Sequence, residues 1–481
     1  MPLPPRPSGR SSPPGRSANA PATDRPPPAA PRRSAAARPS AEDRPSDPRP
    51  DPSPRAPGPA RAVVVGQGYV GLSLAVLAAE AGYAVVGYEV DKERVTRLAA
   101  GDSYIEDVAS RRLRPLLASG AYRASRDPAD CAGFDIAVIT VPTPLHEGLP
   151  DLSHVVESTR MLGGFLRPGA VVVLESTSYP GTTEDLVAPL LEQVSGLVAG
   201  RDFHLGFSPE RIDPGNTRWR LENTPKVVSG VNAASLARIE AFYGAVVETT
   251  VPVSSCRTAE LSKLLENTFR HVNIALVNEL AMFAHERGID VWEAIDAAAT
   301  KPHGFLRFLP GPGVGGHCLP IDPSYLSWWA SGTAGRAFRF VELANDVNSH
   351  MPDYVVRRLA EALTRRGKTV GGARVLLLGL SYKANTSDAR ETPAARIAEL
   401  LLARGADVSA ADPHVAHSVP PASGVLDRVR RVAASSGELS AADAVVLLAD
   451  HDTFDYGLIA ASAAYVLDCR HRLGGDNIDV L

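Results

Sequence analysis

A glycine motif near the start of the globular sequence constrains the fold more than any other feature. Gly66, Gly68 and Gly71 form the pattern GxGxxG directly after the apolar run Ala62–Val65 and directly before the helix-like segment Leu72–Ala81. Glycines at these positions permit a tight turn and let a pyrophosphate approach the first turn of a helix. This context predicts a dinucleotide-binding unit. The alternative is a glycine turn that only packs the helix on the strand.

A carboxylate at the end of the next strand refines this prediction. A second strand is expected over Ala84–Tyr88, and Glu89 follows it, 18 residues after Gly71. A carboxylate there can bind both ribose hydroxyls of NAD and repels the 2′-phosphate of NADP, although Arg94 one helical turn later softens that repulsion. We therefore predict NAD as the cofactor. Its fingerprint residues are Gly66, Gln67, Gly68, Tyr69, Val70 and Gly71.

Strand and helix patterns alternate along most of the chain. Apolar runs at Ile136–Ile139 and Val171–Leu174 continue the first α/β region to about residue 210, and residues 256–300 are helix-like. A Gly/Pro-rich loop is expected over Pro310–Pro323, and strand patterns resume at Val375–Leu378 and Ala444–Leu448. The alternation predicts an α/β fold with two Rossmann-like doubly wound domains. They are joined by a central helical domain with a long helix.

We expect four regions. They are a disordered Pro/Arg-rich tail (1–60), an NAD-binding domain (61–250), a central helical domain with the Cys318 loop (251–350) and a second Rossmann-like domain (351–481). The tail holds 19 of the 41 prolines and 10 arginines against 5 acidic residues. Such a sequence has little to bury. It is either a basic tether or polyproline ligand, or a solvated extension or misplaced start codon.

Composition excludes several classes of protein. A chain of 481 residues is too long for one core, and a net charge of −4 does not suit a nucleic-acid binder. The four cysteines, Cys131, Cys256, Cys318 and Cys469, form no CxxC pair, which argues against a zinc knuckle or a disulfide scaffold. No run of 18 apolar residues or secretory signal is visible, so we expect a cytoplasmic protein that does not cross a membrane.

The stretch around Cys318 carries the most chemical information. Gly313, Gly315 and Gly316 precede it, and Asp322 lies four residues later. The glycines let the backbone wrap a ligand closely and leave the thiol accessible, as a nucleophile must be. A buried structural cysteine is the alternative, and it is the interpretation we give to the other three cysteines. Adjacent His317 is expected to be structural, and no metal site is predicted.

Rare lysines point to a cation for this thiol. The chain has six lysines among its 50 basic residues, so a retained Lys suggests a need for a compact amine. Lys263 and Asn267 are spaced i, i+4 and therefore share one helix face. An ammonium and an amide on one face can together stabilise a developing alkoxide. Taken alone, Lys263 is equally compatible with a surface lysine.

Several further motifs, in order, make the chain resemble a known family. They include Val141-Pro142-Thr143-Pro144, Glu175 to Thr183, Ser208-Pro209-Glu210-Arg211, Ala259 to Asn267, and Tyr382-Lys383 with Asp388 to Pro393. Together with the glycine motif and the Cys318 loop, they resemble the UDP-glucose/GDP-mannose dehydrogenase family of nucleotide-sugar dehydrogenases. The resemblance covers about residues 62–475. It implies NAD bound in the first domain, a homodimer or higher homo-oligomer formed through the long central helix, and a UDP group bound in the last domain.

The resemblance implies a four-electron oxidation of a sugar C6 hydroxyl through a thiohemiacetal and a thioester on Cys318. Lys263 and Asn267 then match the oxyanion-stabilising pair, and Asp322 the carboxylate that works with Lys263 on an ordered water. Glu210 matches the proton-transfer glutamate, and Thr177 a threonine near the nicotinamide. The matched cofactor contacts beyond the glycine motif are Glu89, Arg94, Val141, Pro142, Thr143 and Arg390. The matched substrate contacts are Glu210, Arg211, Lys263, Asn267, Leu309, Gly313, Gly315 and Lys383.

Departures from the UDP-glucose pattern favour another substrate. UDP-glucose enzymes usually carry a second Glu four residues after the first, and Pro214 stands there instead. They also tend to have Pro-Lys-Asp after the nucleophile, whereas this chain has Pro320-Ile321-Asp322. These patterns resemble the branch that oxidises UDP-N-acetylhexosamines, especially UDP-N-acetylglucosamine. UDP-N-acetylmannosamine, UDP-N-acetylgalactosamine and UDP-glucose remain alternatives.

Three other classes of protein fit parts of the sequence. A one-hydride dehydrogenase of the hydroxyacid type shares the fold plan but does not need Cys318. A nucleotide-sugar epimerase would show a catalytic Tyr-x-x-x-Lys pair and form no net NADH; the one such pair here, Tyr88 with Lys92, spans the expected NAD carboxylate Glu89. A non-catalytic binding protein has no reason to keep every matched catalytic side chain.

Overall fold

Two parallel sheets form the framework of the chain, and the first begins at the strand before the glycine motif. Its strands lie in the order β3-β2-β1-β4-β7-β8, and all neighbours are parallel. The order runs outward in both directions from β1, so the switch point of this doubly wound sheet lies between β1 and β4. The strands are β1 (Arg61–Val65), β2 (Ala84–Tyr88), β3 (Tyr122–Ser125), β4 (Ile136–Ile139), β7 (Val171–Leu174) and β8 (His204–Phe207).

Alternate residues of β1 enter two different cores. Ala62 and Val64 pack into the core that contains α1 and α6, whereas Val63 and Val65 pack into the core that contains α4 and α5. A strand that is covered on both faces is apolar throughout, which is why Ala62–Val65 shows no alternation. The helices of this part are α1 (Tyr69–Glu80), α2 (Lys92–Ala99), α3 (Ser110–Ala118), η1 (Pro128–Cys131), α4 (Ser153–Gly163), η2 (Thr182–Val187), α5 (Ala188–Ser195) and α6 (Ala233–Val246).

Two small strand pairs lie outside this sheet. They are the antiparallel pair β5 (Leu145–His146) with β6 (Leu149–Pro150), and the parallel pair β9 (Lys226–Val228) with β10 (Thr250–Pro252).

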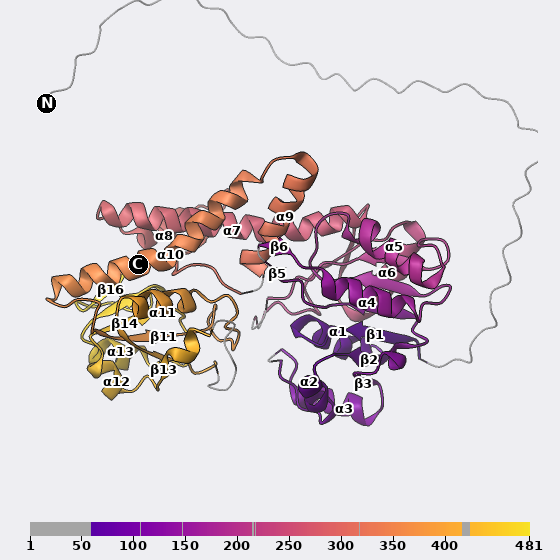
Figure 1. Cartoon of the computed structure of the whole chain (residues 1–481), viewed down its shortest axis with the longest axis horizontal. Helices are drawn as coiled ribbons and strands as arrows, with labels where there is room; N and C mark the ends of the chain where they lie inside the picture. The colour runs from indigo at the N-terminus through magenta and orange to yellow at the C-terminus, as the bar shows by residue number, and fades with distance from the viewer. Residues whose placement is uncertain are drawn as a thin grey trace, which may run out of the picture. The chain divides into compact units, whose positions relative to one another are not determined.

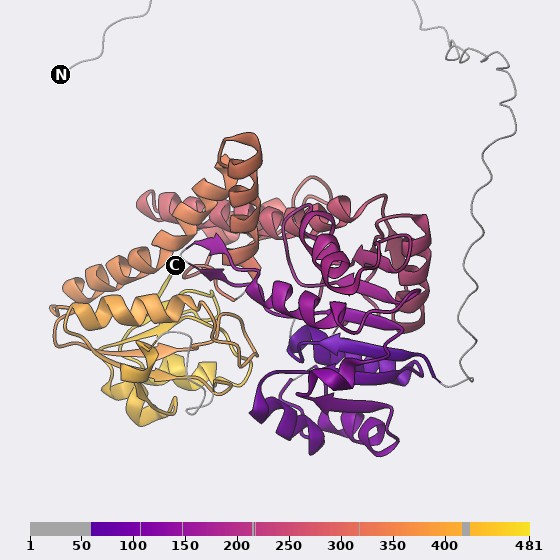
Figure 2. The same cartoon turned by 45° about the vertical axis from the view of Figure 1, so that its right-hand side comes forward.

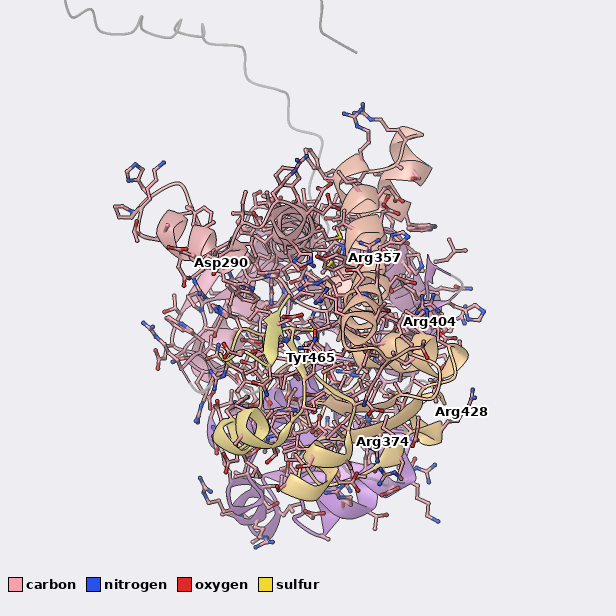
Figure 3. The ribbon with its side chains drawn as sticks, turned by 90° about the vertical axis from the view of Figure 1, so that its left-hand side faces the viewer. Asp290, Arg357, Arg374, Arg404, Arg428 and Tyr465 are labelled. Carbon is pink, nitrogen blue, oxygen red and sulfur yellow. The ribbon has the colours of Figure 1, made fainter. Side chains whose placement is uncertain are left out.

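Long helices make up the central part. The helix α7 (Cys256–Glu286) packs against α9 (Cys318–Ala334) and α10 (Arg339–Arg365), as Figure 1 shows. The helix-like stretch 256–300 proves to be two helices, because Gly288 adopts a φ of 65° and Asp290 caps the second one, α8 (Val291–Ala299). Asp290, which Figure 3 labels, lies at the start of this helix. Its side chain accepts hydrogen bonds from the N–H groups of Trp292 and Glu293.

The second sheet repeats the plan of the first. Its strand order is β13-β12-β11-β14-β15-β16, again all parallel. One face is covered by α10 and α11, and the other by α12 and α13 (Figure 2). The elements are β11 (Arg374–Leu378), α11 (Pro393–Ala403), β12 (Asp407–Ala411), η3 (Leu426–Arg428), β13 (Arg430–Arg431), α12 (Ser436–Ala441), β14 (Ala444–Leu447), α13 (Tyr456–Ser462), β15 (Val466–Asp468) and β16 (Ile478–Val480).

The predicted fold class is confirmed, and the computed structural model describes residues 59–105, 107–146, 148–213, 216, 218–316, 318–415 and 424–481. At Cys318, Thr333 and Ala334 it describes the main chain alone. The Pro/Arg-rich tail expected over residues 1–60 lies outside the described residues except for Pro59 and Ala60. Within the described ranges, no helix is both long and apolar enough to cross a membrane.

One prediction about the central part is wrong. The Gly/Pro-rich loop was expected to continue to Pro323, but α9 begins at Cys318 and contains Pro320 and Pro323. Pro320 lies in the first turn, where the N–H group that proline lacks has no helical partner, whereas Pro323 lies in the second turn and removes one helical hydrogen bond. The boundary expected at residue 350 falls inside α10 (Arg339–Arg365). The second half of this helix, with Met351, Val355 and Leu359, packs into the core of the second sheet.

Candidate active site

The glycine motif forms a cradle at the switch point of the first sheet. Gly66 has a φ of +89°, and a Cβ there would lie 2.9 Å from the carbonyl oxygen of Thr140. A Cβ on Gly71 would lie 1.8 Å from the Gly66 oxygen, so both positions require glycine. Gly68, at the start of α1, instead faces open space, and no described side chain caps this helix. The helix N-terminus is therefore accessible to a pyrophosphate, as NAD binding requires.

Glu89 lies beside this cradle at the end of β2. Its Oε2 accepts a hydrogen bond from the Gln67 N–H at 3.0 Å, and its Oε1 accepts one from the Asp91 N–H at 3.0 Å. Arg94 Nη1 lies 3.5 Å from the same Oε2. These contacts fix the carboxylate at the edge where a ribose would lie, so the residues present fit NAD. Arg94 is the cation expected to weaken the repulsion between Glu89 and a 2′-phosphate, and it lies against this carboxylate.

The side chain of Gln67 has a structural task. It is fully buried, donates to the Val64 carbonyl at 2.9 Å, and accepts a hydrogen bond from the Tyr122 hydroxyl at 2.9 Å. This side chain therefore holds the turn in place and does not face a cofactor. Tyr69 and Val70 open α1 and are partly exposed.

The segment Val141–Thr143 follows β4 on the other side of the switch point and is tied to the central helices. The Ser176 hydroxyl donates to the Val141 carbonyl at 2.7 Å. The buried Tyr325 of α9 donates its hydroxyl hydrogen to the Thr143 carbonyl at 3.1 Å. The predicted cofactor segment, which includes Pro142, is thus joined directly to the helix that begins at Cys318.

Thr177 lies in the segment after β7, which is held at both ends. Ser176 fixes its start, and the buried carboxylate of Glu260 on α7 accepts hydrogen bonds from the N–H groups of Gly181 (2.6 Å) and Thr183 (2.9 Å). Burial raises the pKa of Glu260 to about 7, against the effect of these hydrogen bonds. Thr177 is half-buried. The structure therefore positions the segment of Thr177 beside α7.

Four of the predicted catalytic residues come together between α7, α9 and the segment after β8. Lys263 Nζ donates to the main-chain carbonyl of Glu210 at 2.5 Å. Asn267 Nδ2 donates to Asp322 Oδ2 at 2.5 Å. All four side chains are buried, and Lys263 and Asn267 share one face of α7, as their spacing predicted. The arrangement puts an ammonium, an amide and a carboxylate at one point.

Asp322 faces this group from the first turns of α9. Burial raises its pKa to about 6, although the charge of Lys263 and the Asn267 hydrogen bond both oppose the shift. Its Oδ1 is buried, and no hydrogen-bond partner for it occurs among the described residues. Since Cys318 and Asp322 are four residues apart in one helix, they lie on the same face. The side chain of Cys318 and the whole of His317 lie outside the described residues.

The glycines before Cys318 pack against the last domain. A Cβ on Gly315 would lie 2.5 Å from the carbonyl oxygen of Glu391, and one on Gly316, whose φ is +80°, would lie 2.9 Å from the Tyr382 ring. The Gly316 N–H donates to the Arg390 carbonyl at 3.0 Å. These glycines are therefore needed for close packing as well as for chain freedom.

The rest of the predicted substrate loop is anchored to the central helices and the last domain. The Gly311 N–H donates to the buried Asn278 Oδ1 of α7 at 2.9 Å. A Cβ on Gly313 would lie 3.3 Å from Pro393, and Leu309 is 38% exposed at the start of the loop. The loop thus joins the parts of the chain that carry the predicted catalytic and nucleotide-binding residues.

Two predicted substrate contacts are engaged in ion pairs. Lys383 Nζ lies 2.5 Å from Asp213 Oδ1, and this pair connects the last domain to the segment after Glu210. Arg211 binds both carboxylate oxygens of Glu266 on α7, at 2.9 and 3.3 Å. The predicted cofactor contact Arg390 binds Asp388 through two nitrogens. A carboxylate orients each of these three cations. A ligand that binds one of them would either displace that carboxylate or bind beside it.

Sequence analysis missed three charged residues near the site. Lys226 and Glu175 are buried behind Glu210 and pair with each other. Arg470 Nη1 would lie 2.9 Å from a Cβ on Gly311, which puts a guanidinium against the substrate loop. The rarity of lysine was a usable signal for Lys226, and the family motif from Glu175 to Thr183 included Glu175 without giving it a role, whereas no local pattern pointed to Arg470.

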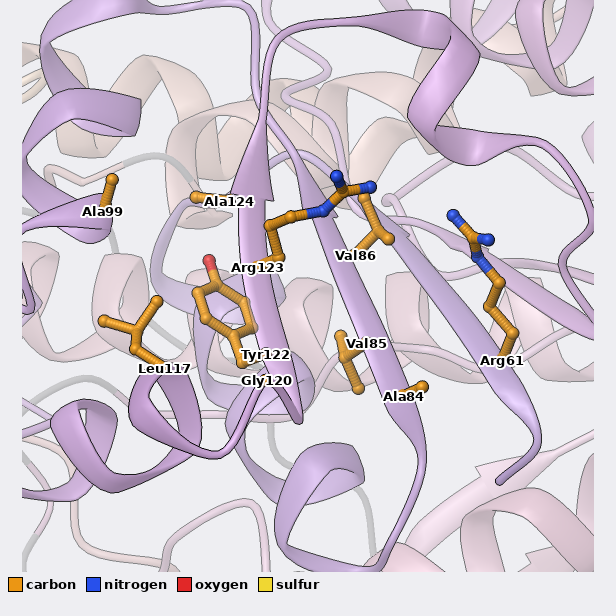
Figure 4. Close-up of a pocket in the computed structure, with 10 residues that line it drawn as sticks. All are labelled: Arg61, Ala84, Val85, Val86, Ala99, Leu117, Gly120, Tyr122, Arg123 and Ala124. Carbon is orange, nitrogen blue, oxygen red and sulfur yellow. The ribbon is translucent and has the colours of Figure 1, made fainter. Parts of the chain in front are cut away.

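A hollow of about 490 Å³ lies elsewhere on the first sheet (Figure 4). It is lined by Arg61, Ala84 and Tyr122, the first residues of β1, β2 and β3. Cofactors of doubly wound sheets bind at the carboxyl ends of the strands. This hollow lies at the amino ends and is therefore not the cofactor site.

Family models match almost the whole described chain in the expected order. The NAD-binding domain of the UDP-glucose/GDP-mannose dehydrogenase family matches residues 60–247, its central domain 257–350, and its UDP-binding domain 376–474. The chain belongs to this family. It is an NAD-dependent nucleotide-sugar dehydrogenase, as the sequence predicted.

Curated relatives of this dehydrogenase differ in their sugars. A UDP-N-acetyl-D-mannosamine dehydrogenase of Pyrococcus horikoshii is 36% identical over 395 residues, which cover 82% of this chain and 90% of the relative. A UDP-N-acetyl-D-glucosamine 6-dehydrogenase of Pseudomonas aeruginosa is 38% identical over 360 residues, which cover 74% of this chain and 83% of the relative. The family of the chain is therefore clear, while these two relatives are named for different acetamido sugars.

Solved structures support the same fold. The UDP-N-acetylmannosamine dehydrogenase of Pyrococcus horikoshii matches with a TM-score of 0.79 at 34% identity, covering 87% of this chain and 98% of the other. A UDP-glucose dehydrogenase of Pyrobaculum islandicum matches with a TM-score of 0.77 at 28% identity, covering 89% and 98%. The dehydrogenase thus shares its whole architecture, and not one domain alone, with both.

Proposed function

We propose that this dehydrogenase oxidises the C6 hydroxyl of a UDP-N-acetylhexosamine, with UDP-N-acetylglucosamine as the first candidate, to the uronic acid. One observation carries the proposal. Lys263, Asn267 and Asp322 gather beside the helix that begins at Cys318, and Tyr325 of this helix binds the segment Val141–Thr143 expected to contact NAD. A thiol, an oxyanion site and a hydride acceptor are thus expected at one place.

Bound NAD supplies the hydride acceptor for each of two oxidations. In the first, the C6 hydroxyl becomes an aldehyde, and Lys263 with Asn267 stabilises negative charge on its oxygen. The Cys318 thiolate then adds to the aldehyde carbon and holds it as a thiohemiacetal. The second oxidation converts this adduct to a thioester. Water attacks the thioester, Glu210 takes the proton, and the acid and free thiol result.

The buried residues suit these steps. Lys263 is held by the Glu210 carbonyl at 2.5 Å, so its ammonium has a fixed position before the substrate arrives. Asp322, with its pKa raised by burial to about 6, can exchange a proton near neutral pH with a water beside Lys263. The oxidation consumes one water per sugar, and two hydrides leave C6.

The choice of sugar rests on sequence and on relatives. Pro214 and Ile321 depart from the UDP-glucose pattern, and relatives at 36% and 38% identity are named for the two UDP-N-acetylhexosamines. UDP-N-acetylmannosamine is the second candidate, since the Pyrococcus horikoshii relative carries that name over 82% of this chain. The family's UDP-binding model over residues 376–474 supports a UDP group for either sugar.

We also propose that two copies of the chain assemble through α7. The buried face of this helix combines the polar side chains Glu260, Lys263 and Asn267 with apolar ones, while a second set of apolar side chains is exposed. The exposed apolar residues of α7 are Leu261, Leu265, Phe269, Leu276, Leu280 and Phe283. Contiguous apolar surface of this kind marks an interface. A second copy is the occupant that the family resemblance implies.

The test is a product count. Purified protein receives excess NAD with UDP-N-acetylglucosamine, UDP-N-acetylmannosamine or UDP-glucose, and NADH formed is compared with sugar consumed. Two NADH per sugar, abolished in Cys318→Ala, is the expected result. One NADH per sugar would contradict the thioester and indicate a one-hydride dehydrogenase. Turnover of UDP-glucose alone would contradict the choice of sugar.

A further inference from the structure

A cluster of buried charges lies directly behind Glu210. Lys226, the first residue of β9, binds Glu175 Oε1 and lies 3.4 Å from Glu210 Oε2. The second oxygen of Glu175 accepts a hydrogen bond from the Tyr243 hydroxyl at 2.6 Å. The side chain of Lys226 is 2% exposed and that of Glu175 is 0% exposed. One ammonium therefore serves two carboxylates away from water.

Glu210 is the most exposed member of this cluster. Its side chain retains 11% exposure, more than either partner. Its other oxygen, Oε1, accepts hydrogen bonds from the N–H groups of Arg211, at 2.7 Å, and Ile212. The carboxylate is thus fixed in orientation on one side by backbone and on the other by Lys226. Any change in the charge of the cluster therefore alters the pKa of Glu210, the member that can reach a substrate.

The charges compete for one another. Burial raises the pKa of Glu175 to about 7, even against the attraction of Lys226. Burial opposes the ionised form of Glu210 as well, but Lys226 and Lys263 hold its pKa below the ordinary value. Burial would lower the pKa of Lys226, yet the two carboxylates raise it. With one cation between two buried carboxylates, a proton that enters the cluster goes to Glu175 and leaves Glu210 ionised.

The charged or titratable neighbours of Glu210 in the described chain include Arg211, next to it in the sequence, and side chains from four other elements. Lys226 comes from β9, Lys263 from α7, Glu175 from the end of β7 and Tyr243 from α6. A purely structural role for the cluster, as a clamp between β7 and β9, is the competing interpretation. Such a clamp affects stability but gives no reason for Lys226 to reach beyond Glu175 to Glu210.

We propose that Lys226 is a positioning residue that keeps Glu210 a carboxylate during turnover, while Glu175 shares this ammonium and takes up a proton that enters the cluster. The inference rests on the proposed function, in which Glu210 accepts a proton from water. Lys226 supplies the attraction that keeps the charge on Glu210. Glu175 shares this attraction and, when it takes up a proton, leaves more of it to Glu210. Neither residue needs to touch the substrate.

The test compares kcat against pH for three variants with UDP-N-acetylglucosamine, or with whichever of the three tested UDP-sugars turns over. Lys226→Met removes the cation and leaves two buried carboxylates side by side. We expect an acid limb that lies about one pH unit or more above that of the wild type. Glu175→Gln removes one negative charge and keeps an acceptor for Tyr243. Its acid limb is expected to stay in place or move to lower pH.

The double variant Lys226→Met/Glu175→Gln is the matched control, because the cluster regains the net charge of the wild type. Its acid limb should return toward the wild-type position. If Lys226→Met does not fold, the double variant is compared with Glu175→Gln. These two proteins differ only at Lys226, and the limb of the double variant should lie higher.

A loss of kcat by the same factor at every pH, with no return in the double variant, overturns the inference and indicates a structural clamp. The NADH count separates this failure from a failure of the proposed function. Two NADH per sugar in the wild type with unmoved limbs overturns the role of Lys226 and Glu175 alone. One NADH per sugar overturns the proposed thioester whatever the pH profiles do.

Discussion

Asn267 on α7 and Asp322 on α9 are joined by a hydrogen bond of 2.5 Å between two buried side chains 55 residues apart. The bond leaves Oδ1 of the carboxylate buried, and no partner for it occurs in the described parts of the chain. A buried carboxylate without a full set of partners costs stability when it is ionised. Ionised Asp322 therefore lowers the stability of the protein, a cost that is consistent with the catalytic role proposed for it.

Asp322→Asn is expected to stabilise the protein while it lowers kcat about 100-fold or more. Burial raises the pKa of Asp322 to about 6 in the folded protein, above its value of about 3.9 in an unfolded chain. The wild type therefore loses stability as pH rises from roughly 4 to 6, and the loss is complete above pH 6. The variant should melt roughly 2–4 °C higher than the wild type at pH 8.

The difference in melting temperature should shrink toward pH 4, where the wild-type carboxyl is protonated. Scanning calorimetry of both proteins from pH 4.5 to 8 measures it. A variant that melts lower than the wild type at pH 8 would contradict the prediction.

Lys263→Met is expected to lower kcat by about 10²–10³-fold with little change in KM, because the ammonium acts on charge that develops during the reaction. Lys263→Arg should rescue little of this loss, since a planar guanidinium does not fit where a compact amine donates to the Glu210 carbonyl at 2.5 Å. Lys301→Met, at an exposed lysine, is the control and should stay within about twofold of the wild type. Steady-state kinetics of the three variants decide the matter.

How much of this site the sequence could predict depends on the range of the contacts. The i, i+4 spacing of Lys263 and Asn267 predicts their shared face, and the structure confirms it. The partners of that face, Glu210 and Asp322, lie 53 and 55 residues away, and only tertiary packing brings them there. Their roles could be predicted because the family motifs carry them, and not from any local rule.

The segment after Cys318 shows where local rules fail. Pro320 and Pro323 suggested a loop, yet both lie in α9. The N–H that Pro323 lacks would have bonded the carbonyl of Leu319, so one helical hydrogen bond is lost, and the helix continues because α9 packs against α7 and α10. The helix α7 shows a second limit, because helical spacing predicts an amphipathic helix without telling which face is buried. Here the chemistry of Lys263 and Asn267 requires the polar face inside.

Asp213 and Lys383 offer a test of substrate binding. Their ion pair of 2.5 Å is well exposed, so it contributes at most about 1 kcal/mol. If Lys383 leaves Asp213 to bind the nucleotide sugar, Asp213→Asn should lower KM for the sugar by up to about fivefold. Lys383→Met should raise KM by about tenfold or more, with kcat less affected. Equal KM values in all three proteins would remove Lys383 from the substrate site.

Glu89 and Arg94 are expected to set the choice between NAD and NADP. Glu89→Gln removes the charge that repels a 2′-phosphate and leaves Arg94, 3.5 Å away in the wild type, without its anion. The ratio of kcat/KM for NADP to that for NAD should rise about tenfold. Adding Arg94→Ala should cancel most of this gain. An unchanged ratio in Glu89→Gln would mean that other residues read the ribose.

The apolar face of α7 gives the last prediction. Leu265 is 63% exposed and Leu276 is 53% exposed on the described chain, and a charge at either position would be buried without a partner if a second copy covers this face. Leu265→Glu and Leu276→Glu should therefore shift the protein from twice 50.8 kDa to a single chain in light scattering after gel filtration.

Val194→Glu is the matched control for both variants. Val194 is an apolar residue of α5 that is 43% exposed, away from α7. A glutamate there should leave the mass unchanged. A wild type that already elutes as a single chain would contradict assembly through this face. Dissociation in Val194→Glu as well would show that the effect of added charge is not specific to α7. A mass change confined to the α7 variants, with melting temperatures retained, identifies the exposed apolar residues of α7 as the interface.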